Sequence, residues 1–473
     1  MIKLTINNAV CRLQNNPKVV GMVARYLEFK HPSYFHMQSL MNRGWDGMIR
    51  PMSKAGTFST GLLPRVLEFL VKTLEDFDSE IEVLDTRIIP PLTDDPIPIK
   101  IGKLTLYPHQ REAIESVLDN SLFGIPWPRG YIFAGMGAGK TLIMFGIYIA
   151  YGKPKTVIFV DNSKLYNQLK ADLREIFPNE YGYLQGQSYQ PGNIIIAMVK
   201  SSANRLKEDP HFFSDVLAVL VDEADLSANK TYKTVLGGCP EAAVRLGFSG
   251  TIFLRDLKKD KLLNNTLEER FGKIIYKINS KELSELKIIP KAIIKLIPGI
   301  TPKQTFLDFK EEFDTVIANN PEHYKIVLAR VRYNLLTHKS PIMVFTRFMA
   351  QTDALGIFLR EHLNVRVEYV HHKSVSDEVI LDFKEGRIPV LVCSLFLKRG
   401  LSFPLLKCII NASAGEFYSN PLQILGRGTR NSTNKDRFYF EDILDNGKYL
   451  SNHSKKRVLH YKREGYVIRD LRV

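Results

Sequence analysis

Short apolar runs recur along the chain, and longer polar stretches with helical spacing separate them. One series of runs lies at 130–135, 156–161, 193–198 and 216–225, and a second lies at 341–346, 365–370, 389–394 and 407–413. Runs of this length, rich in β-branched and aromatic residues, indicate buried strands, and their alternation with helices indicates parallel sheets covered by helices. We therefore expect an α/β protein with two tandem parallel-sheet domains.

Shifts in composition divide the chain further. Residues 1–95 have a mixed α/β pattern and end in a proline-rich acidic stretch, which indicates a small accessory domain and a linker. Residues 96–285 and 286–473 then each contain one series of strands. The polar segment 254–273 has the pattern of a helix whose charges face solvent.

The sequence AGMGAGKT at 134–141 has the spacing of a phosphate-binding loop, although an alanine occupies its usual first glycine position. An apolar strand precedes the loop and a proline-free helix follows it, so the first-turn N–H groups of that helix can face an anion. A plain glycine turn between a strand and a core helix is the alternative. The predicted phosphate contacts are Gly135, Met136, Gly137, Ala138, Gly139, Lys140 and Thr141.

A second acidic element supports the phosphate-binding interpretation. The apolar run VLAVLVDEAD ends in Asp222 and Glu223, and ligands of open α/β sheets bind at the carboxyl ends of strands. Asp222, together with the Thr141 hydroxyl, would hold Mg²⁺, which prefers oxygen ligands. Glu223 would orient and deprotonate an attacking water. An acidic loop that caps a helix through Asp225 is the alternative.

Charge and cysteine content limit the class of protein. The formal net charge is +15 and the pI is about 9.4, values that suit a polyanionic partner or a basic solubilising surface. The four cysteines form no C-x-x-C pair, so neither a zinc site nor a disulfide framework is expected. The beginning of the chain has no apolar segment typical of a signal peptide. We expect no membrane contact and a location in the cytoplasm.

Four segments in order, AGMGAGKT, VDEAD, FSGT and QILGRGTR, resemble motifs I, II, III and VI of superfamily 2 helicases. In that superfamily an alanine at the start of motif I is usual. The resemblance implies two RecA-like domains, ATP and Mg²⁺ as cofactors, and an adenine site at Tyr107 and Gln110. It also implies coupling through Ser249, Gly250 and Thr251, a motif V contact at Gly400, and ATP-sensing residues Gln423, Arg427 and Arg430 from the second domain.

The motifs that touch nucleic acid in that superfamily match less well. Asp161 and Asn162 replace the usual Pro-Thr pair of motif Ia, Met198 replaces a threonine in motif Ib, and Ser402 replaces an aspartate in motif V. These departures put the backbone contacts in doubt. The residues expected at the nucleic-acid strand are Lys164, Gln168, Thr346, Arg347, His372 and Ser394.

The flanking segments resemble phage UvsW-type helicases, through WDG at 45–47, GLL at 61–63 and HSKKR at 453–457. That resemblance implies a monomeric enzyme that remodels branched DNA, such as forks and Holliday junctions, in replication, recombination or repair. Trp45 could stack on DNA bases or could anchor a small core. The helix around HSKKR could contact phosphates or could be a solvated terminal helix.

Three other functions stay open at this stage. An RNA helicase is suggested by the letters DEAD in motif II. An ATP-gated nucleic-acid clamp would keep the binding residues without hydrolysis. A restriction-type motor subunit would need a partner that cuts DNA.

Overall fold

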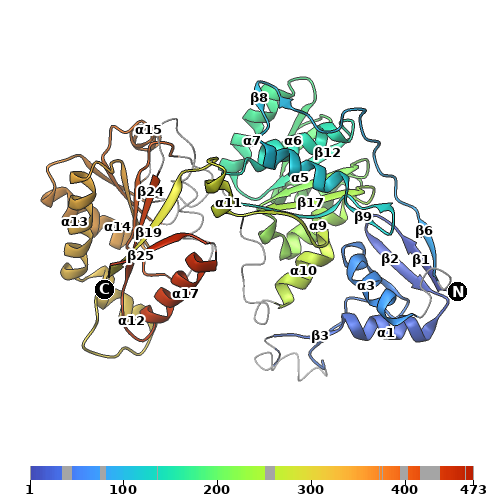
Figure 1. Ribbon diagram of the computed structural model, residues 1–473, viewed down its shortest axis with the longest axis horizontal. Coiled ribbons are helices and arrows are strands. Elements are labelled where there is room, and N and C mark those ends of the chain that lie inside the picture. The colour runs from blue at the N-terminus through green and yellow to red at the C-terminus, as the bar shows by residue number, and fades with distance from the viewer. Residues whose placement is uncertain are drawn as a thin grey trace. The chain divides into compact units, whose positions relative to one another are not determined.

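The computed structural model describes residues 2–32, 34, 45–74, 81–135, 137–250, 261–371, 373–374, 376–394, 403–415, 437–463 and 465–471. The chain forms two compact units (Figure 1). The first comprises Met1–Ala134 and Gly139–Lys277, and the second comprises Gly135–Ala138 and Ile278–Val473. No helix in the described ranges combines the length and apolar character that a membrane crossing requires.

The first unit begins with a small four-stranded sheet in the order β5-β2-β1-β6. Strand β1 pairs antiparallel with β2 and parallel with β6. One compact cluster of apolar side chains from this sheet and its helices also includes Trp127, which lies beyond the proline-rich stretch in the chain. The elements are β1 (Ile2–Ile6), β2 (Val10–Gln14), α1 (Pro17–Leu27), β3 (Phe29–Lys30), β4 (Met48–Ile49), β5 (Thr57–Ser59), η2 (Thr60–Leu62), α3 (Leu63–Thr73) and β6 (Ile81–Asp85).

The larger sheet of the first unit has the order β14-β13-β15-β12-β16-β17-β11-β18. Its strands from β13 to β11 pair in parallel, and β14 is antiparallel to β13. Its strands are β11 (Arg129–Ala134), β12 (Thr156–Val160), β13 (Tyr181–Gln185), β14 (Ser188–Gln190), β15 (Ile194–Met198), β16 (Ala218–Asp222), β17 (Val244–Ser249) and β18 (Ile274–Ile278). Its helices are α5 (Pro108–Leu118), α6 (Lys140–Ala150), α7 (Ser163–Ile176), α8 (Val199–Glu208), η3 (Ala224–Ala228), α9 (Lys230–Gly237) and α10 (Lys261–Phe271). Two short hairpins, β7 (Lys100–Ile101) with β8 (Leu104–Thr105) and β9 (Ser121–Leu122) with β10 (Ile125–Pro126), complete the unit.

The second unit is built on a seven-stranded sheet in the order β21-β22-β20-β23-β24-β19-β25, and all its neighbouring strands pair in parallel. Its strands are β19 (Lys291–Pro298), β20 (Ile342–Thr346), β21 (Val367–Val370), β22 (Val390–Ser394), β23 (Cys408–Asn411), β24 (Arg437–Leu444) and β25 (Val467–Asp470). Its helices are α11 (Ser280–Glu285), α12 (Phe309–Phe313), η4 (Asp314–Ala318), α13 (Pro321–Leu336), α14 (Met349–His362), α15 (Asp377–Lys384) and α17 (Leu450–Arg463).

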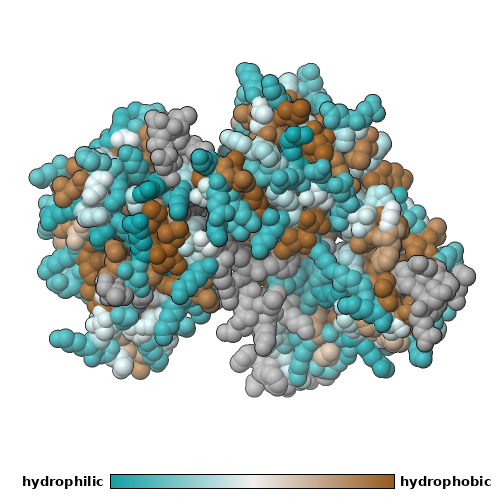
Figure 2. All heavy atoms as spheres, in the orientation of Figure 1, coloured by the Kyte–Doolittle hydropathy of each residue, from teal (hydrophilic) through white to brown (hydrophobic). Residues whose placement is uncertain are grey.

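The predicted fold class is confirmed in both units. The predicted apolar runs form central strands of the sheets. Strands β12, β15 and β16 are buried almost throughout, which explains their apolar sequences, because such strands are covered on both faces. On the face of the molecule that Figure 2 shows, apolar residues gather in patches between polar ones. In the first unit β17 lies between β11 and β16, so the carboxyl ends of these three strands share one edge of the sheet.

Candidate functional site

The glycine-rich loop joins β11 to α6 at this edge. Ala134 is the last residue of β11 and is fully buried, so it occupies strand backbone that any residue can adopt. Gly139 precedes α6 with a left-handed backbone, φ +76°, and Gly137 has φ +89°. Glycine adopts such angles without steric cost. The alanine at the first loop position therefore fits, and the two glycines stand where the backbone needs them.

Gln110 of α5 lies directly against the loop. Its side chain is 2% exposed, and its Oε1 accepts a hydrogen bond from the backbone N–H of Tyr107 at 2.9 Å. A Cβ at Gly139 would stand 2.2 Å from the Gln110 Nε2. The neighbouring Tyr107 is 47% exposed and its ring stacks on that of His109. The predicted adenine-site pair therefore adjoins the phosphate loop within the first unit.

The first turn of α6 carries Lys140 and Thr141, both partly exposed. The Lys140 Nζ donates to the carbonyl of Ala134 at 3.3 Å, so the ammonium lies over the loop. The first N–H groups of a helix have no partner within it, and the helix dipole adds partial positive charge there. This end of α6 is therefore suited to bind a phosphate group.

Acidic groups meet at the carboxyl end of β16. Asp222 is 5% exposed, and its Oδ1 accepts from the backbone N–H of Glu223 at 2.8 Å. Glu223 has a left-handed backbone, φ +50°, which is unusual for a residue with a side chain and often occurs at functional sites. Burial raises the pKa of the nearby Tyr232, and the charges of Asp161 and Glu223 raise it further. The site is rich in negative charge, which a divalent cation would offset.

The strand beside β16 is joined to this acidic turn. Ser249 ends β17, and its hydroxyl donates to the Asp225 carboxylate at 3.0 Å. Gly250 follows it and is partly exposed. A hydrogen bond thus connects the predicted motifs II and III. Asp225 belongs to the acidic turn and also accepts this bond from the neighbouring strand β17.

Arg270 of α10 holds the far end of the same turn. Its guanidinium donates to three successive backbone carbonyls, those of Ser227, Ala228 at 3.2 Å and Asn229 at 3.0 Å. Burial lowers the pKa of Arg270. The prediction that the charges of this helix face solvent is therefore wrong for Arg270. No local sequence pattern indicates this role for Arg270, because its partners lie more than forty positions away in the chain.

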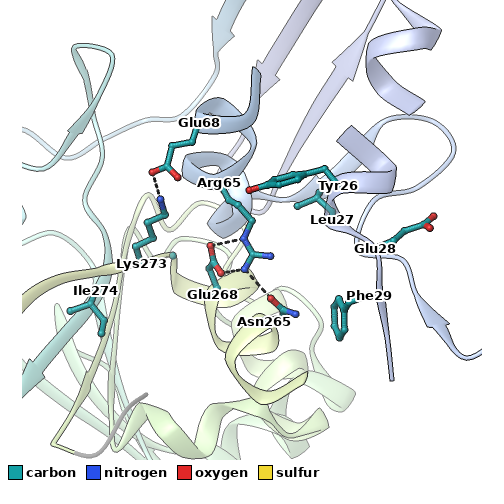
Figure 3. Close-up of a pocket in the computed structure, with 11 residues that line it drawn as sticks. Tyr26, Leu27, Glu28, Phe29, Arg65, Glu68, Asn265, Glu268, Lys273 and Ile274 are labelled. Carbon is teal, nitrogen blue, oxygen red and sulfur yellow. Dashed lines mark hydrogen bonds and ion pairs between the residues drawn. The ribbon is translucent and has the colours of Figure 1, made fainter. Parts of the chain in front are cut away.

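The small sheet region docks on the other side of α10. Arg65 of α3 pairs with Glu268 and donates to Asn265 at 2.9 Å, and Lys273 pairs with Glu68 (Figure 3). The cavity beside these pairs has a volume of about 560 Å³. Its two cations are already paired with Glu268 and Glu68, and Glu28 adds a further negative charge to the lining, so the cavity is poorly suited to a polyanion.

The two tryptophans have different environments. Trp127 is 2% exposed, and the guanidinium of Arg87 lies 4.6 Å from its ring centroid. Trp45 is partly exposed, donates to the Met48 carbonyl at 3.3 Å and contacts the rings of His31 and Tyr34 edge-on. The core anchor of this region is therefore Trp127, and part of Trp45 can be reached from solvent.

Several residues predicted to contact nucleic acid lie at the carboxyl ends of strands in the second unit. Thr346 of β20 and Ser394 of β22 are paired in register and buried. The Thr346 hydroxyl donates to the Cys393 carbonyl at 3.2 Å. Arg347 is partly exposed, and its guanidinium lies 4.6 Å from the ring centroid of Phe309. In the first unit Gln168 is exposed on α7, where the backbone of Lys164 also lies.

The helix around HSKKR is partly buried and so is not simply solvated, while Lys455 and Lys462 are exposed and their contact with phosphates stays a prediction. Arg457 is 1% exposed, and its Nε donates to the Asp442 carboxylate at 2.9 Å while its Nη1 donates to the Gly415 carbonyl at 2.8 Å. Tyr461 is fully buried and donates to the same carboxylate at 3.0 Å. These side chains anchor α17 to the second sheet.

Several residues named from the motifs lie outside the described part of the chain: Met136, Thr251, His372, Gly400, Ser402, Gln423, Arg427 and Arg430.

Two family models match the chain. Residues 103–254 match "Type III restriction enzyme, res subunit", and residues 325–432 match "Helicase conserved C-terminal domain". A curated relative, the putative ATP-dependent helicase IRC3 of Saccharomyces cerevisiae, is 23% identical over 360 residues, which cover 71% of this chain and 51% of the relative. The chain thus spans about half the length of that relative.

Solved structures share the fold. The crystal structure of T4 UvsW covers 99% of both chains at 17% identity, with a TM-score of 0.47. S. cerevisiae Dbp5, solved bound to RNA and ADP BeF3, matches 77% of this chain and 90% of its own at 14% identity, with a TM-score of 0.51. Identities this low establish the fold alone and do not choose a substrate.

Proposed function

Because the chain belongs to superfamily 2 of the helicases, we propose that it is an ATP-driven motor that remodels branched DNA by branch migration. The ATP-driven part of this proposal is supported by one observation. The glycine-rich loop and the acidic turn follow strands of the same sheet at the same edge, and Gln110 of α5 lies against the loop. The branched-DNA part is supported by the flanking segments that resemble UvsW-type helicases.

The residues present fit ATP with Mg²⁺. Gly137 and Gly139 provide a loop that phosphates can approach closely, and Lys140 supplies a positive charge beside it. Asp222 and the Thr141 hydroxyl offer oxygen ligands to Mg²⁺, which would neutralise phosphate charge when bound. Glu223 would hold and deprotonate the attacking water. Gln110 would recognise the adenine, with Tyr107 beside it.

Coupling of hydrolysis to movement is assigned to three elements. The bond between Ser249 and Asp225 would transmit changes at the phosphates from motif II to motif III. Arg427 and Arg430 would stabilise the charge that develops on the γ-phosphoryl group, and Gln423 would act beside them. Contacts with the tracked nucleic-acid strand are assigned to Lys164, Gln168, Thr346, Arg347, His372 and Ser394.

The domain arrangement follows the same proposal. Residues 1–95 would form an accessory domain that binds DNA, residues 96–285 would bind ATP, and residues 286–473 would form the second motor domain. Trp45 supports the accessory role because it is an aromatic residue that solvent can reach.

DNA is favoured over RNA for two reasons. Gln110 lies in a short YPHQ element, in contrast to the longer element typical of DEAD-type RNA helicases. The first matching family model is named for a restriction enzyme, and restriction is a reaction of DNA. An RNA helicase is the second candidate, because the acidic turn reads DEAD and the fold is shared with Dbp5.

The deciding experiment measures the steady-state ATPase rate with Mg²⁺ at one salt concentration. The nucleic acids are single-stranded DNA, linear duplex, a four-way junction and structured RNA, and the Lys140→Ala protein gives the background. We expect the strongest stimulation from the junction. Strongest stimulation by RNA would replace the DNA assignment, and binding without any hydrolysis would indicate an ATP-gated clamp.

A further inference from the structure

The second unit carries a row of cations at the edge of its sheet opposite to the predicted strand contacts. Its strands run in parallel, so their amino ends share one edge. In the order β20-β23-β24-β19, these ends carry Lys339, Lys407, Arg437 and Lys291. The strand ends are neighbours in the sheet, because Arg437 is paired with Lys291 and the Lys407 N–H donates to the Pro341 carbonyl at 3.1 Å. Cys408 is paired with Tyr439, so Lys407 and Arg437 occupy alternate positions of the pleat at the same edge.

The charge of this basic edge is poorly compensated. The buried Glu441 lies behind it, but its two oxygens already accept from Arg330 at 2.7 Å each and pair with Lys295 at 3.3 Å. The described residues 287–291, 337–341 and 403–407, at the starts of three of these strands, contain no acidic side chain. Among the described residues named here, four edge cations and two cations behind them thus face the carboxylate of Glu441.

Two tyrosines contact Lys339, at one end of the row, and Lys295 behind it. The Lys339 Nζ lies 4.6 Å from the ring centroids of both Tyr333 and Tyr439. The Lys295 Nζ lies 5.0 Å and 5.1 Å from the same two rings. Burial, and then the charge of Lys295, lower the pKa of Lys339. Ammonium groups held this close together repel each other, and an anion bound between them would relieve the repulsion.

The spacing of the row suits a nucleic-acid duplex. Neighbouring strands lie about 4.8 Å apart, so four of them span about 15 Å. A duplex presents one phosphate charge per about 1.7 Å of its axis, which gives about nine charges over that span. The carboxyl end of β20, at Thr346, lies about 15 Å from its amino end by strand geometry. A single tracked strand at Thr346 would therefore not also cover the basic edge.

We propose that this basic edge binds the phosphates of a duplex DNA arm, separate from the strand that the motor tracks. This inference rests on the proposed function and deepens it, because a branched substrate supplies a second arm. Contacts with phosphates carry no sequence information, so the edge would hold any arm in position.

The test neutralises the three exposed cations on β19, β24 and the start of β23, as the triple variant Lys291→Gln, Lys407→Gln, Arg437→Gln. The control triple variant Lys103→Gln, Lys325→Gln, Lys384→Gln removes the same charge from other parts of the chain. Affinity for a four-way junction, a linear duplex and single-stranded DNA is measured by fluorescence anisotropy over a range of salt concentrations.

The edge variant should bind the junction about tenfold more weakly, and its salt slope should fall by about 2.7, since each lost phosphate contact removes about 0.9. Its affinity for single-stranded DNA, its ATPase rate without DNA and its thermal unfolding should match those of the control. Equal losses of affinity in the two variants, or no loss in the edge variant, would overturn the proposal. If the unmodified protein binds no nucleic acid at all, the proposed function itself fails.

Discussion

Replacing Gly139 by alanine should disable the phosphate loop through its contact with Gln110. The new Cβ would stand 2.2 Å from the Gln110 Nε2, so the end of this buried side chain must shift, and we expect the shift to break its bond to the Tyr107 N–H. That bond is worth about 1 kcal/mol. The left-handed backbone at φ +76° adds about 1–2 kcal/mol for alanine. If the loop relieves this total of about 2–3 kcal/mol by leaving its phosphate-binding conformation, that conformation is populated roughly 30- to 150-fold less and kcat/KM for ATP falls by the same factor.

A double-mutant cycle separates the two causes. Once Gln110→Ala has removed the obstructing amide, Gly139→Ala should cost only the backbone term, so the two losses should fall short of additivity by about 1 kcal/mol. Gly124 is a matched control, because it has φ +78° and a Cβ added there would meet nothing within 4 Å. Gly124→Ala should lower stability alone and leave the ATPase unchanged. Additive losses at Gly139 and Gln110 would refute the contact.

Three further outcomes are expected. Glu223→Gln should lower hydrolysis by about 100-fold or more while ATP binding is retained, measured by turnover and by equilibrium binding; loss of binding would mean that Glu223 is structural. Arg270→Ala should lower kcat about tenfold with the KM for ATP within twofold, because the carbonyls of the turn after motif II, from Ser227 onward, lose a charged donor; an unchanged kcat in a stably folded protein would remove it from the site. Burial raises the pKa of Cys11 to about 11 and that of Cys239 to about 12, so at pH 8, below these values, both thiols are protonated, and a thiol reagent should label them only after denaturation. Rapid labelling of the folded protein would show that these regions open easily.

Much of the fold could be predicted because it depends on local pattern. The strands β12, β15 and β16 are apolar and covered on both faces, and such strands show in the sequence as short continuous runs. A phosphate-binding loop could be proposed for a similar reason, since its spacing and its strand and helix neighbours all lie within about twenty residues.

The sequence was a poorer guide wherever a charged or aromatic side chain had two possible environments. Trp45 and Trp127 are chemically alike, yet only Trp127 is enclosed in the core. Arg457 stands in a run of cations that suggests a surface, and it is buried against Asp442. Composition gives the charge of a residue but not the partner that burial will provide.

Periodicity and spacing are properties of neighbouring residues, so the two parallel sheets and the order of the motifs could be predicted without coordinates. Three features depend instead on tertiary packing: Gln110 lies against Gly139, Arg270 donates to the carbonyls of the acidic turn, and the cations of four separate strands share one edge of the sheet. Each of these contacts joins residues far apart in the chain, and no local pattern specifies which distant groups packing will bring together.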